Sequence, residues 1–230
     1  MPTRVNALAV MTKAPIPGSV KTRMVPPLTY EQAAELCRAL LLDQLEHLSA
    51  LVDIDLYVAF SPQEAEPLIK SVLPAGYKSF PQLGEDLGAR MNRVFDELWR
   101  RGHGHAAIIG SDVAAPPLNF FYDMFKQLSS PVRKVVLGPS QDGGYYLVGM
   151  NRPTPEIFSD MTWSHDQVLA QTTDRLTSLG VDFAFLPQWF DLDTLEDLRR
   201  LETCSDPAVR EAMKQTLRFF RQLRAPGHGL

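Results

Sequence analysis

The stretch that decides the fold is VNALAVM at residues 5–11, which runs directly into TKAPIPGSVKTRM at residues 12–24. The first part is apolar, as in a buried strand, and the second places Lys13, Lys21 and Arg23 within eleven residues. The prolines of this loop fix φ and its glycine permits unusual φ, so the loop has a defined shape. Loops at the carboxyl ends of strands are where α/β sheets bind ligands. The stretch therefore predicts an anion site, with a nucleotide phosphate as the expected ligand; the alternative is a solvated surface turn.

The composition limits the class of protein. The chain has 230 residues, a length that fits one domain, and it is 45% hydrophobic and 22% charged with a net charge of −4. A negative net charge disfavours a nucleic-acid-binding surface, which is normally basic. No stretch approaches the ~20 apolar residues of a membrane span, and the N-terminal apolar run is too short for a signal peptide. Only two cysteines are present, Cys37 and Cys204, which suits a reducing compartment, so we expect a cytoplasmic protein.

Strand and helix signals alternate along the chain. Strands are expected at residues 5–11, 53–60, 78–81, 106–110, 134–138, 145–149 and 183–186, and helices at 29–49, from 61, at 86–99, 117–128 and 166–179, from 194 and from 207. This order predicts a mostly parallel sheet with helices on both faces. The junction at Gly143-Gly144 is too short for a crossover helix, so we expect an antiparallel strand beside it. One domain is expected over residues 1–230, with a flexible tail from about residue 224.

Two acidic residues follow predicted strands and could carry chemistry. Asp112 ends the GSD sequence after the strand at 106–110, where a carboxylate would project into the ligand crevice and could bind Mg²⁺. The alternative for Asp112 is a helix N-cap. Asp142 precedes Gly143 and Gly144, which permit close approach of a bound group. The alternative there is a tight hairpin turn.

Two further segments give weaker signals. Asp191 and Asp193 would point the same way in an extended segment; the alternative is that they belong to a helix start, where the dipole favours anions. Gly84 and Asp86 precede a predicted helix that carries Arg90. This arginine could reach a phosphate or a base edge; the alternative is a capped helix with an exposed arginine.

Taken in order, these segments resemble one known family. The motifs that carry the resemblance are KAP at 13–15, PG at 17–18, KTR at 21–23, residues 84–91, GSD at 110–112, GP at 138–139, DGGYY at 142–146, WS at 163–164 and DLDT at 191–194. They are similar to the bacterial family of glycosyltransferase-like proteins called radical-SAM/selenodomain-associated transferase 1, within the nucleotide-diphospho-sugar transferase superfamily. The resemblance covers most of the chain. It implies the GT-A type α/β fold, a three-layer sandwich with a mostly parallel central sheet.

The resemblance also implies roles for individual residues. The residues it implies for nucleotide binding are Lys13, Pro17, Gly18, Lys21, Arg23, Gly84, Asp86 and Arg90, the last three near the base or ribose. Those implied for catalysis are Asp112, Lys21 and Asp142. Asp112 and Asp193 are implied as ligands of Mg²⁺ or Mn²⁺. The residues implied beside the metal or the acceptor are Asp191, Gly143, Gly144 and Trp163.

The implied function is that of a nucleotide-dependent transferase. Family membership favours glycosyl transfer from a nucleotide-diphospho-sugar to an acceptor that the sequence does not identify. The alternative is Mg²⁺-dependent nucleotidyl transfer from a nucleoside triphosphate to a small phosphorylated or acidic acceptor. It is favoured by SDVA at residues 111–114, which has one carboxylate where many metal-dependent glycosyltransferases have an Asp-x-Asp pair. A third, less favoured hypothesis is a nucleotide-binding module without turnover.

Overall fold

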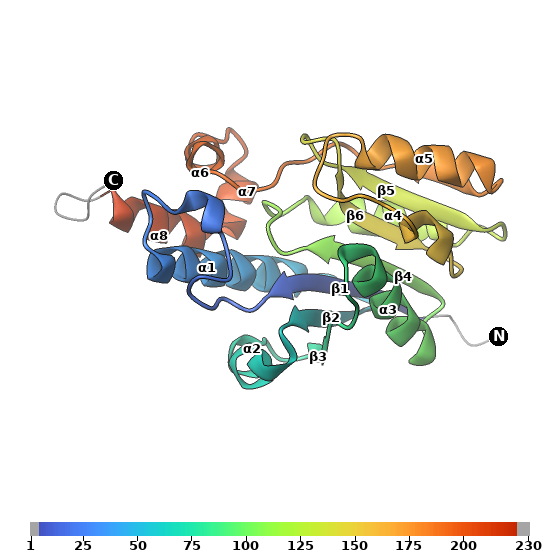
Figure 1. Cartoon of the computed structure of the whole chain (residues 1–230), viewed down its shortest axis with the longest axis horizontal. Coiled ribbons are helices and arrows are strands. Elements are labelled where there is room, and N and C mark those ends of the chain that lie inside the picture. Colours follow the sequence, from blue (N-terminus) through green and yellow to red (C-terminus); the bar gives the residue numbers. More distant parts are fainter. Residues whose placement is uncertain (1–4, 225–230) are drawn as a thin grey trace.

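The computed structural model describes residues 5–224 (Figure 1). This part of the chain forms one seven-stranded sheet in the order β3-β2-β1-β4-β6-β5-β7. The strands are β1 (Asn6–Lys13), β2 (Ile54–Ser61), β3 (Lys78–Pro81), β4 (His105–Gly110), β5 (Lys134–Pro139), β6 (Tyr145–Met150) and β7 (Asp182–Phe185). Neighbouring strands are parallel except where β6 pairs with β4 and β5. The predicted mostly parallel sheet is confirmed, and its antiparallel member is the strand that follows Gly143-Gly144.

Helices cover both faces of the sheet. Leu8 and Val10 of β1 belong to a core with α1 (Tyr30–Leu48), α2 (Glu66–Val72) and α4 (Leu118–Leu128). Ala7 and Ala9 belong to the opposite core, with α3 (Leu87–Arg100) and α5 (Val168–Ser178). Successive strand side chains point to opposite faces, and a strand that is buried on both faces is apolar throughout. This is why VNALAVM has no polar alternation, and it makes the protein the predicted three-layer sandwich.

Three C-terminal helices form a third core with the N-terminal half of α1. They are α6 (Leu195–Glu202), α7 (Pro207–Ala212) and α8 (Lys214–Leu223), and Figure 1 shows α8 beside α1. The carboxylate of Asp43 in α1 anchors α8, because it accepts hydrogen bonds from the backbone N–H groups of Gln215 and Thr216 at 3.0 and 2.8 Å. Short 3₁₀ helices are η1 (Thr22–Met24), η2 (Gln63–Ala65) and η3 (Pro155–Phe158). The helix expected from residue 61 begins at Glu66, after η2.

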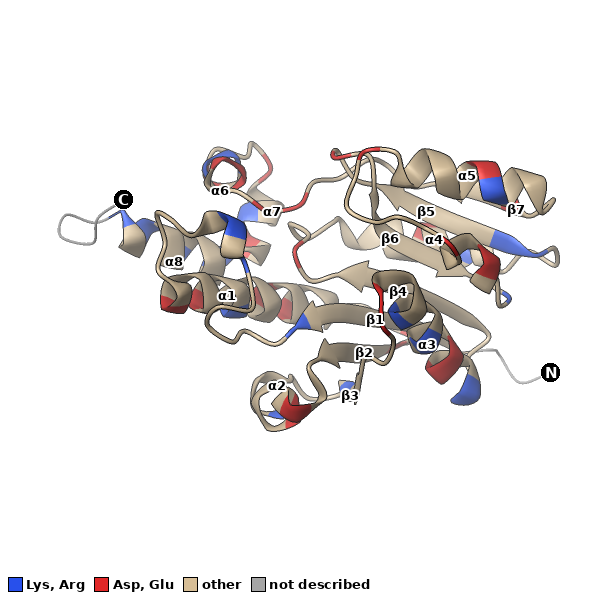
Figure 2. Cartoon of the chain, viewed as in Figure 1, with Lys and Arg blue, Asp and Glu red and all other residues tan. Residues whose placement is uncertain are grey.

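Charges of both signs are distributed over the helices. Figure 2 shows lysines and arginines interspersed with acidic residues along α2, α3 and α5. Within residues 5–224, no helix has the length and apolar character needed to cross a membrane. The flexible tail predicted from about residue 224 lies, beyond Arg224 itself, outside the described residues.

Candidate active site

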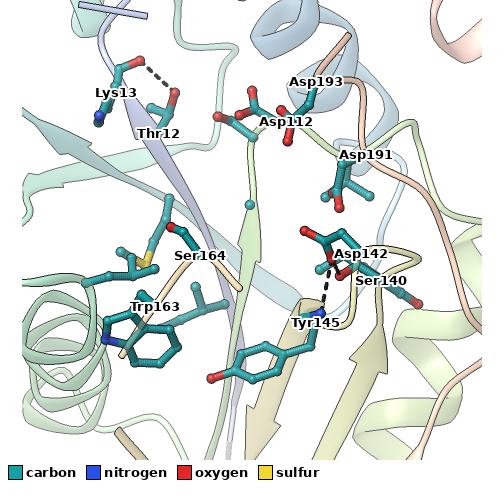
Figure 3. A pocket seen from close by; sticks show the side chains of 18 of the residues that line it. Thr12, Lys13, Asp112, Ser140, Asp142, Tyr145, Trp163, Ser164, Asp191 and Asp193 are labelled. Atoms are coloured by element: carbon teal, nitrogen blue, oxygen red, sulfur yellow. Dashed lines mark hydrogen bonds between the residues drawn. The ribbon is translucent and has the colours of Figure 1, made fainter. Parts of the chain in front are cut away.

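A pocket of about 570 Å³ opens at the edge of the sheet where β1 and β4 end and β6 begins (Figure 3). This is the edge at which open α/β sheets bind their ligands. The basic residues that line the pocket are Lys13, Lys21, Arg23 and Arg90, and the acidic residues that line it are Asp112, Asp142, Asp191 and Asp193. The segment 163–165 also lines it, and Figure 3 shows Trp163 and Ser164 across the pocket from Asp191 and Asp142.

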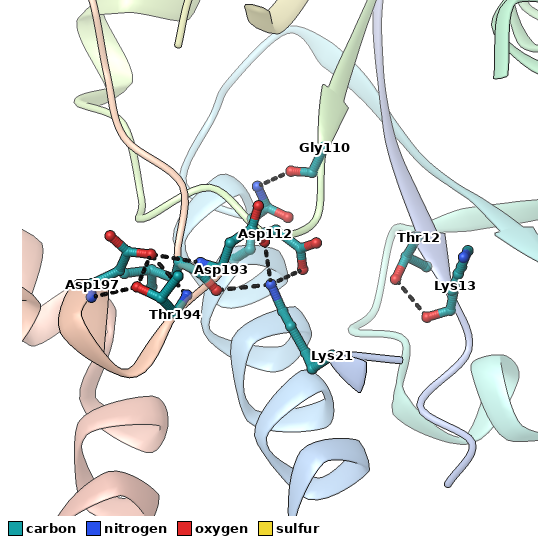
Figure 4. A network of polar contacts seen from close by, with 10 residues as sticks. Thr12, Lys13, Lys21, Gly110, Asp112, Asp193, Thr194 and Asp197 are labelled. Carbon is teal, nitrogen blue, oxygen red and sulfur yellow. Dashed lines mark hydrogen bonds and ion pairs between the residues drawn. The ribbon is translucent and has the colours of Figure 1, made fainter. Parts of the chain in front are cut away.

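Lys21 lies at the point where two of these carboxylates converge (Figure 4). Its Nζ is 3.0 Å from Asp112 Oδ1 and 2.9 Å from Asp193 Oδ1, and it donates to the carbonyl oxygen of Leu192 at 2.8 Å. The Lys21 side chain is 5% exposed, whereas those of Asp112 and Asp193 are 44% and 46% exposed. Burial lowers the pKa of Lys21, but the two carboxylates outweigh burial and hold this pKa above its ordinary value. The ammonium is therefore charged, and it contacts the two carboxylates from the side that faces the protein interior.

Backbone pairing brings the two carboxylates together. The segment after β4 runs beside the segment before α6, with a bridge between Val113 and Asp191. Leu192 donates its N–H to the carbonyl of Asp112 at 2.8 Å, and Ala114 donates to Phe190 at 3.2 Å. Asp112 and Asp193 are thus fixed next to each other although 81 residues separate them in the sequence.

Neither aspartate caps a helix with its side chain, although Asp193 lies at a helix start, directly before the N-cap Thr194 of α6. Helix α4 begins at Leu118 with no side-chain cap, so Asp112 caps nothing there. Helix α6 is capped by a box in which Thr194 and Asp197 exchange hydrogen bonds. Asp193 contributes only its backbone N–H to that box, at 3.0 Å from Asp197 Oδ2. Its carboxylate is left to contact Lys21.

Asp191 lies between Asp193 and Asp142 along one wall of the pocket (Figure 3). The pKa of this carboxyl group is raised to about 7, mainly by burial and then by the carboxylates of Asp193, Asp142 and Asp112 in that order. The Lys21 ammonium opposes this shift. Asp191 therefore changes its charge near neutral pH.

Asp142 belongs to a tight turn between β5 and β6. Its Oδ1 accepts hydrogen bonds from the hydroxyl of Ser140 and from the N–H of Gly144, the latter at 3.1 Å. Gly143 has φ +88°, and a Cβ there would lie 2.1 Å from the carbonyl oxygen of Asp166. The group that lies close to Gly143 is thus the backbone of Asp166, and the predicted turn is present. The Asp142 carboxylate is exposed and lines the pocket.

The first loop contributes cations to the pocket unevenly. Lys13 and Arg23 line the pocket and are exposed, so their charged groups are open to an anion. Lys21 is expected from the sequence to bind phosphate, but its ammonium contacts three protein oxygens in the structure. Arg90 lines the pocket and donates through Nε to the carbonyl of Gly84 at 3.0 Å.

Several residues implied by the resemblance lie outside the pocket lining. These are Pro17, Gly18, Gly84, Asp86 and Gly143. Asp86 caps α3 by accepting from the N–H of Ala89 at 2.8 Å. Gly84 has φ +136°, and a Cβ there would lie 2.8 Å from backbone atoms of Ala89 and Arg90. The positions of Gly84 and Asp86 are thus explained by local structure at the start of α3.

Sequence reasoning did not single out some residues that line the pocket. Gln82 donates from Nε2 to the carbonyls of Thr12 and Ala59 at 3.0 and 2.7 Å, which ties the ends of β1 and β2 together. His165 follows the Trp163-Ser164 motif and completes that wall. A signal for Gln82 was its position directly after β3, at the same edge as Lys13; no comparable signal marks His165.

The pair Asp112 and Asp193 is the donor set in which a divalent cation could be held. Mg²⁺ and Mn²⁺ accept carboxylate oxygens, and Mg²⁺ sites often combine one or two carboxylates with substrate phosphates and water. In residues 5–224, no group of three or more His, Cys, Asp or Glu side chains has metal-site geometry. The two carboxylates fit a divalent cation in chemistry and convergence, but the Lys21 ammonium lies at their meeting point.

The fold and the position of this pocket define the protein as having the GT-A type fold of nucleotide-diphospho-sugar transferases. The chain belongs to the family of uncharacterized proteins conserved in bacteria called DUF2064, which matches residues 44–165, more than half of the chain. No curated protein matches the sequence.

Solved structures support the same assignment. A protein from Desulfovibrio desulfuricans G20, provisionally named a nucleotide-diphospho-sugar transferase, is 26% identical with a TM-score of 0.83, covering 96% of this chain and 98% of its own. A CMP:2-keto-3-deoxy-manno-octonic acid synthetase complexed with CTP is 11% identical with a TM-score of 0.54, covering 91% and 99%. The mannosyltransferase PcManGT from Pyrobaculum calidifontis, in complex with GDP-Man and Mn²⁺, is 10% identical with a TM-score of 0.50, covering 97% and 76%. The last two likenesses show the fold alone. The superfamily inferred from the sequence is confirmed.

Proposed function

We propose that this protein is a nucleotide-dependent transferase that moves a glycosyl group from a nucleotide-diphospho-sugar to a small acceptor. The observation that carries the proposal is the pocket itself, in which exposed cations of the first loop face a row of carboxylates at the ligand-binding edge of the sheet. Nearly the whole chain is similar to a protein provisionally named a nucleotide-diphospho-sugar transferase. The two free cysteines, Cys37 and Cys204, support a cytoplasmic location.

The cationic wall is proposed to bind the nucleotide. Lys13 and Arg23 are exposed on the pocket and would contact the diphosphate, with Lys21 behind them. Arg90 lies at the start of α3 and would contact the base or ribose. Charge-assisted hydrogen bonds to phosphate would become stronger as charge develops on the leaving nucleoside diphosphate, which is how such contacts accelerate a transfer.

The carboxylate wall is proposed to face the acceptor. Glycosyl transfer breaks the bond between the anomeric carbon and the phosphate oxygen, while an acceptor hydroxyl bonds to that carbon and releases its proton. Asp142 is oriented through Oδ1 by Ser140 and Gly144 and is exposed to the pocket, so its carboxylate would accept this proton. Asp191, Gly144 and Trp163 line the same space and would position the acceptor.

Mg²⁺ or Mn²⁺ is proposed to be held by Asp112 and Asp193, where it would neutralise charge on the substrate phosphates. Their side chains are half-exposed toward the pocket, so phosphate oxygens could complete the ligand set. PcManGT, which shares the fold, is described in complex with GDP-Man and Mn²⁺.

A second function, nucleotidyl transfer from a nucleoside triphosphate, is favoured by one observation. The strand β4 is followed by a single carboxylate, Asp112, in place of an Asp-x-Asp pair. The second carboxylate of the site comes from the distant segment before α6. The synthetase that shares the fold is described in complex with CTP.

A ligand panel distinguishes these functions. Nucleoside diphosphate sugars and nucleoside triphosphates are screened by thermal shift with and without Mg²⁺, and hits are incubated with candidate sugar and phosphate acceptors. A glycosyltransferase releases nucleoside diphosphate and forms no pyrophosphate. Release of pyrophosphate that requires an acceptor and is lost in Asp112→Asn would establish nucleotidyl transfer instead. If no nucleotide shifts the melting temperature, both functions are wrong. If a nucleotide binds but no acceptor gives turnover, the protein is a nucleotide-binding module without turnover.

A further inference from the structure

The ammonium of Lys21 already contacts both carboxylates of the pair and offsets one of their two negative charges. An ammonium has three donors and no acceptor, and the three contacts of Lys21 Nζ, at 2.8, 2.9 and 3.0 Å, use all three donors. Two of the three acceptors are the Oδ1 atoms of Asp193 and Asp112. These are the atoms on which a shared divalent cation would depend.

A divalent cation bound to the same two Oδ1 atoms would compete with the ammonium for them. Metal–oxygen distances for Mg²⁺ are about 2.0–2.1 Å, so a cation bound to both Oδ1 atoms would lie at most about 5 Å from Nζ, which is 3.0 Å or less from each of them. Two positive centres at such separation repel strongly, and the repulsion is poorly screened because the Lys21 side chain is 5% exposed.

We propose that Lys21 and a divalent cation are alternative occupants of one position between Asp112 and Asp193. Lys21 keeps the nucleotide-free site poor in metal, and a metal enters only together with nucleotide phosphates, which give the ammonium a new anionic partner. This inference rests on the proposed nucleotide-binding function and adds an order of events to it. Lys21 thereby couples metal binding to nucleotide binding.

The test measures metal binding directly, without turnover. Nucleotide-free protein is titrated with Mn²⁺, and free Mn²⁺ is followed by electron paramagnetic resonance. Replacing Lys21 by methionine keeps the length of the side chain and removes its charge, so we expect Lys21→Met to bind Mn²⁺ at least tenfold more tightly than the wild type. The double variant Lys21→Met with Asp112→Asn should lose this gain, which assigns the new affinity to the pair.

Lys214 provides a matched control. Its Nζ also lies between two carboxylates, 2.8 Å from Glu46 Oε1 and 3.7 Å from Glu211 Oε1, but its side chain is 49% exposed and lies outside the pocket. Lys214→Met removes the same charge and frees two carboxylates, so it corrects for non-specific binding. We expect its Mn²⁺ affinity to match the wild type.

Two results would overturn the inference. One is a Lys21→Met variant, shown to be folded by circular dichroism, whose Mn²⁺ affinity equals or falls below that of the wild type. If this variant does not fold, the wild type and Asp112→Asn decide, because nucleotide-free wild type should bind Mn²⁺ too weakly for Asp112→Asn to change its affinity twofold. The second contrary result is that nucleotide-free wild type binds Mn²⁺ tightly and that Asp112→Asn abolishes this binding. Calorimetric titration with GDP and UDP is separate: if neither binds, the proposed function fails, whatever Mn²⁺ does.

Discussion

Two lysines of this protein each lie between two carboxylates, yet their surroundings differ. Lys21 contacts Asp112 and Asp193 at 3.0 and 2.9 Å from inside the pocket wall, and its side chain is 5% exposed. Lys214 contacts Glu46 and Glu211 at 2.8 and 3.7 Å on the surface, and its side chain is 49% exposed. A carboxylate oxygen within 3.0 Å of a lysine Nζ therefore occurs both in a buried and in a solvated cluster.

The two clusters differ in how far water can solvate the charges when an ion pair is broken. Exposed ion pairs contribute little because solvent and salt screen them and their side chains lose entropy on pairing. A buried charge that loses its partner keeps its desolvation cost, so breaking a buried pair is strongly destabilising. Lys21 also satisfies its third donor on the carbonyl of Leu192, which ties η1 to the segment before α6. Lys21 thus helps to hold the structure of the site together.

The largest expected effect tests this contrast in stability. Lys21→Met removes three contacts and leaves Asp112 and Asp193 side by side without a counter-ion. We expect the free energy of unfolding to fall by about 3 kcal/mol, the low end of the range for a broken buried pair, because both carboxylates are partly hydrated. Urea unfolding followed by circular dichroism measures it, with Lys214→Met expected to unfold like the wild type. Equal losses in the two variants would remove the distinction between the clusters.

The sequence predicted the framework of this fold from local features. The apolar stretch at 5–11 indicated a strand, and the short Gly143-Gly144 junction indicated an antiparallel neighbour; β1, which is buried on both faces, and β6 confirm both. The helices expected from residues 29 and 194 are present as α1 and α6, which begin directly after the capping residues Thr29 and Thr194. These features are predictable because they depend on residues within a few positions of each other.

The arrangement of the site depends on contacts that local patterns do not encode. Lys21 and Asp193 are 172 residues apart, and the bridge from Val113 to Asp191 that aligns the carboxylates is an isolated pairing outside the strands. The sequence also did not indicate that Lys21 is buried. Its neighbours in the loop, Lys13 and Arg23, are exposed although all three have the same charge. Their roles in nucleotide binding stay predictions.

An intermediate effect is expected on nucleotide affinity. Lys13 and Arg23 present exposed charges to the pocket, so Lys13→Ala and Arg23→Ala should each weaken binding of a nucleoside diphosphate by about 1.5 kcal/mol, roughly tenfold in Kd. Calorimetric titration measures the change, with Lys214→Ala as the charge-matched control. Unchanged affinity in both loop variants, beside wild-type melting temperatures, would mean that the first loop is only a surface turn.

The smallest expected effect is a pH dependence of stability that comes from Asp191, one of the carboxyl groups near Lys21. Asp191 is half-buried beside Asp193, Asp142 and Asp112, and its pKa is raised to about 7, with Lys21 opposing the shift. The folded protein therefore holds a proton on Asp191 that the unfolded chain releases near pH 4. The stability that this proton provides is complete below about pH 4 and is lost as the pH rises through 7.

The variant Asp191→Asn isolates this contribution, because asparagine keeps the volume of the side chain and carries no charge at any pH. Burial lowers the pKa of His47 and of His103, so the stability due to these histidines rises with pH and opposes the slope from Asp191. The useful quantity is therefore the difference between variant and wild type, in which the histidines cancel. We expect the free energy of unfolding of Asp191→Asn, relative to wild type, to increase by about 1 kcal/mol between pH 4.5 and pH 8. That is less than the full pKa shift would give, because the side chain keeps some contact with water. Urea unfolding at four pH values measures the difference, and a difference that is flat across this range would show that Asp191 titrates normally and that Lys21 balances its acidic neighbours.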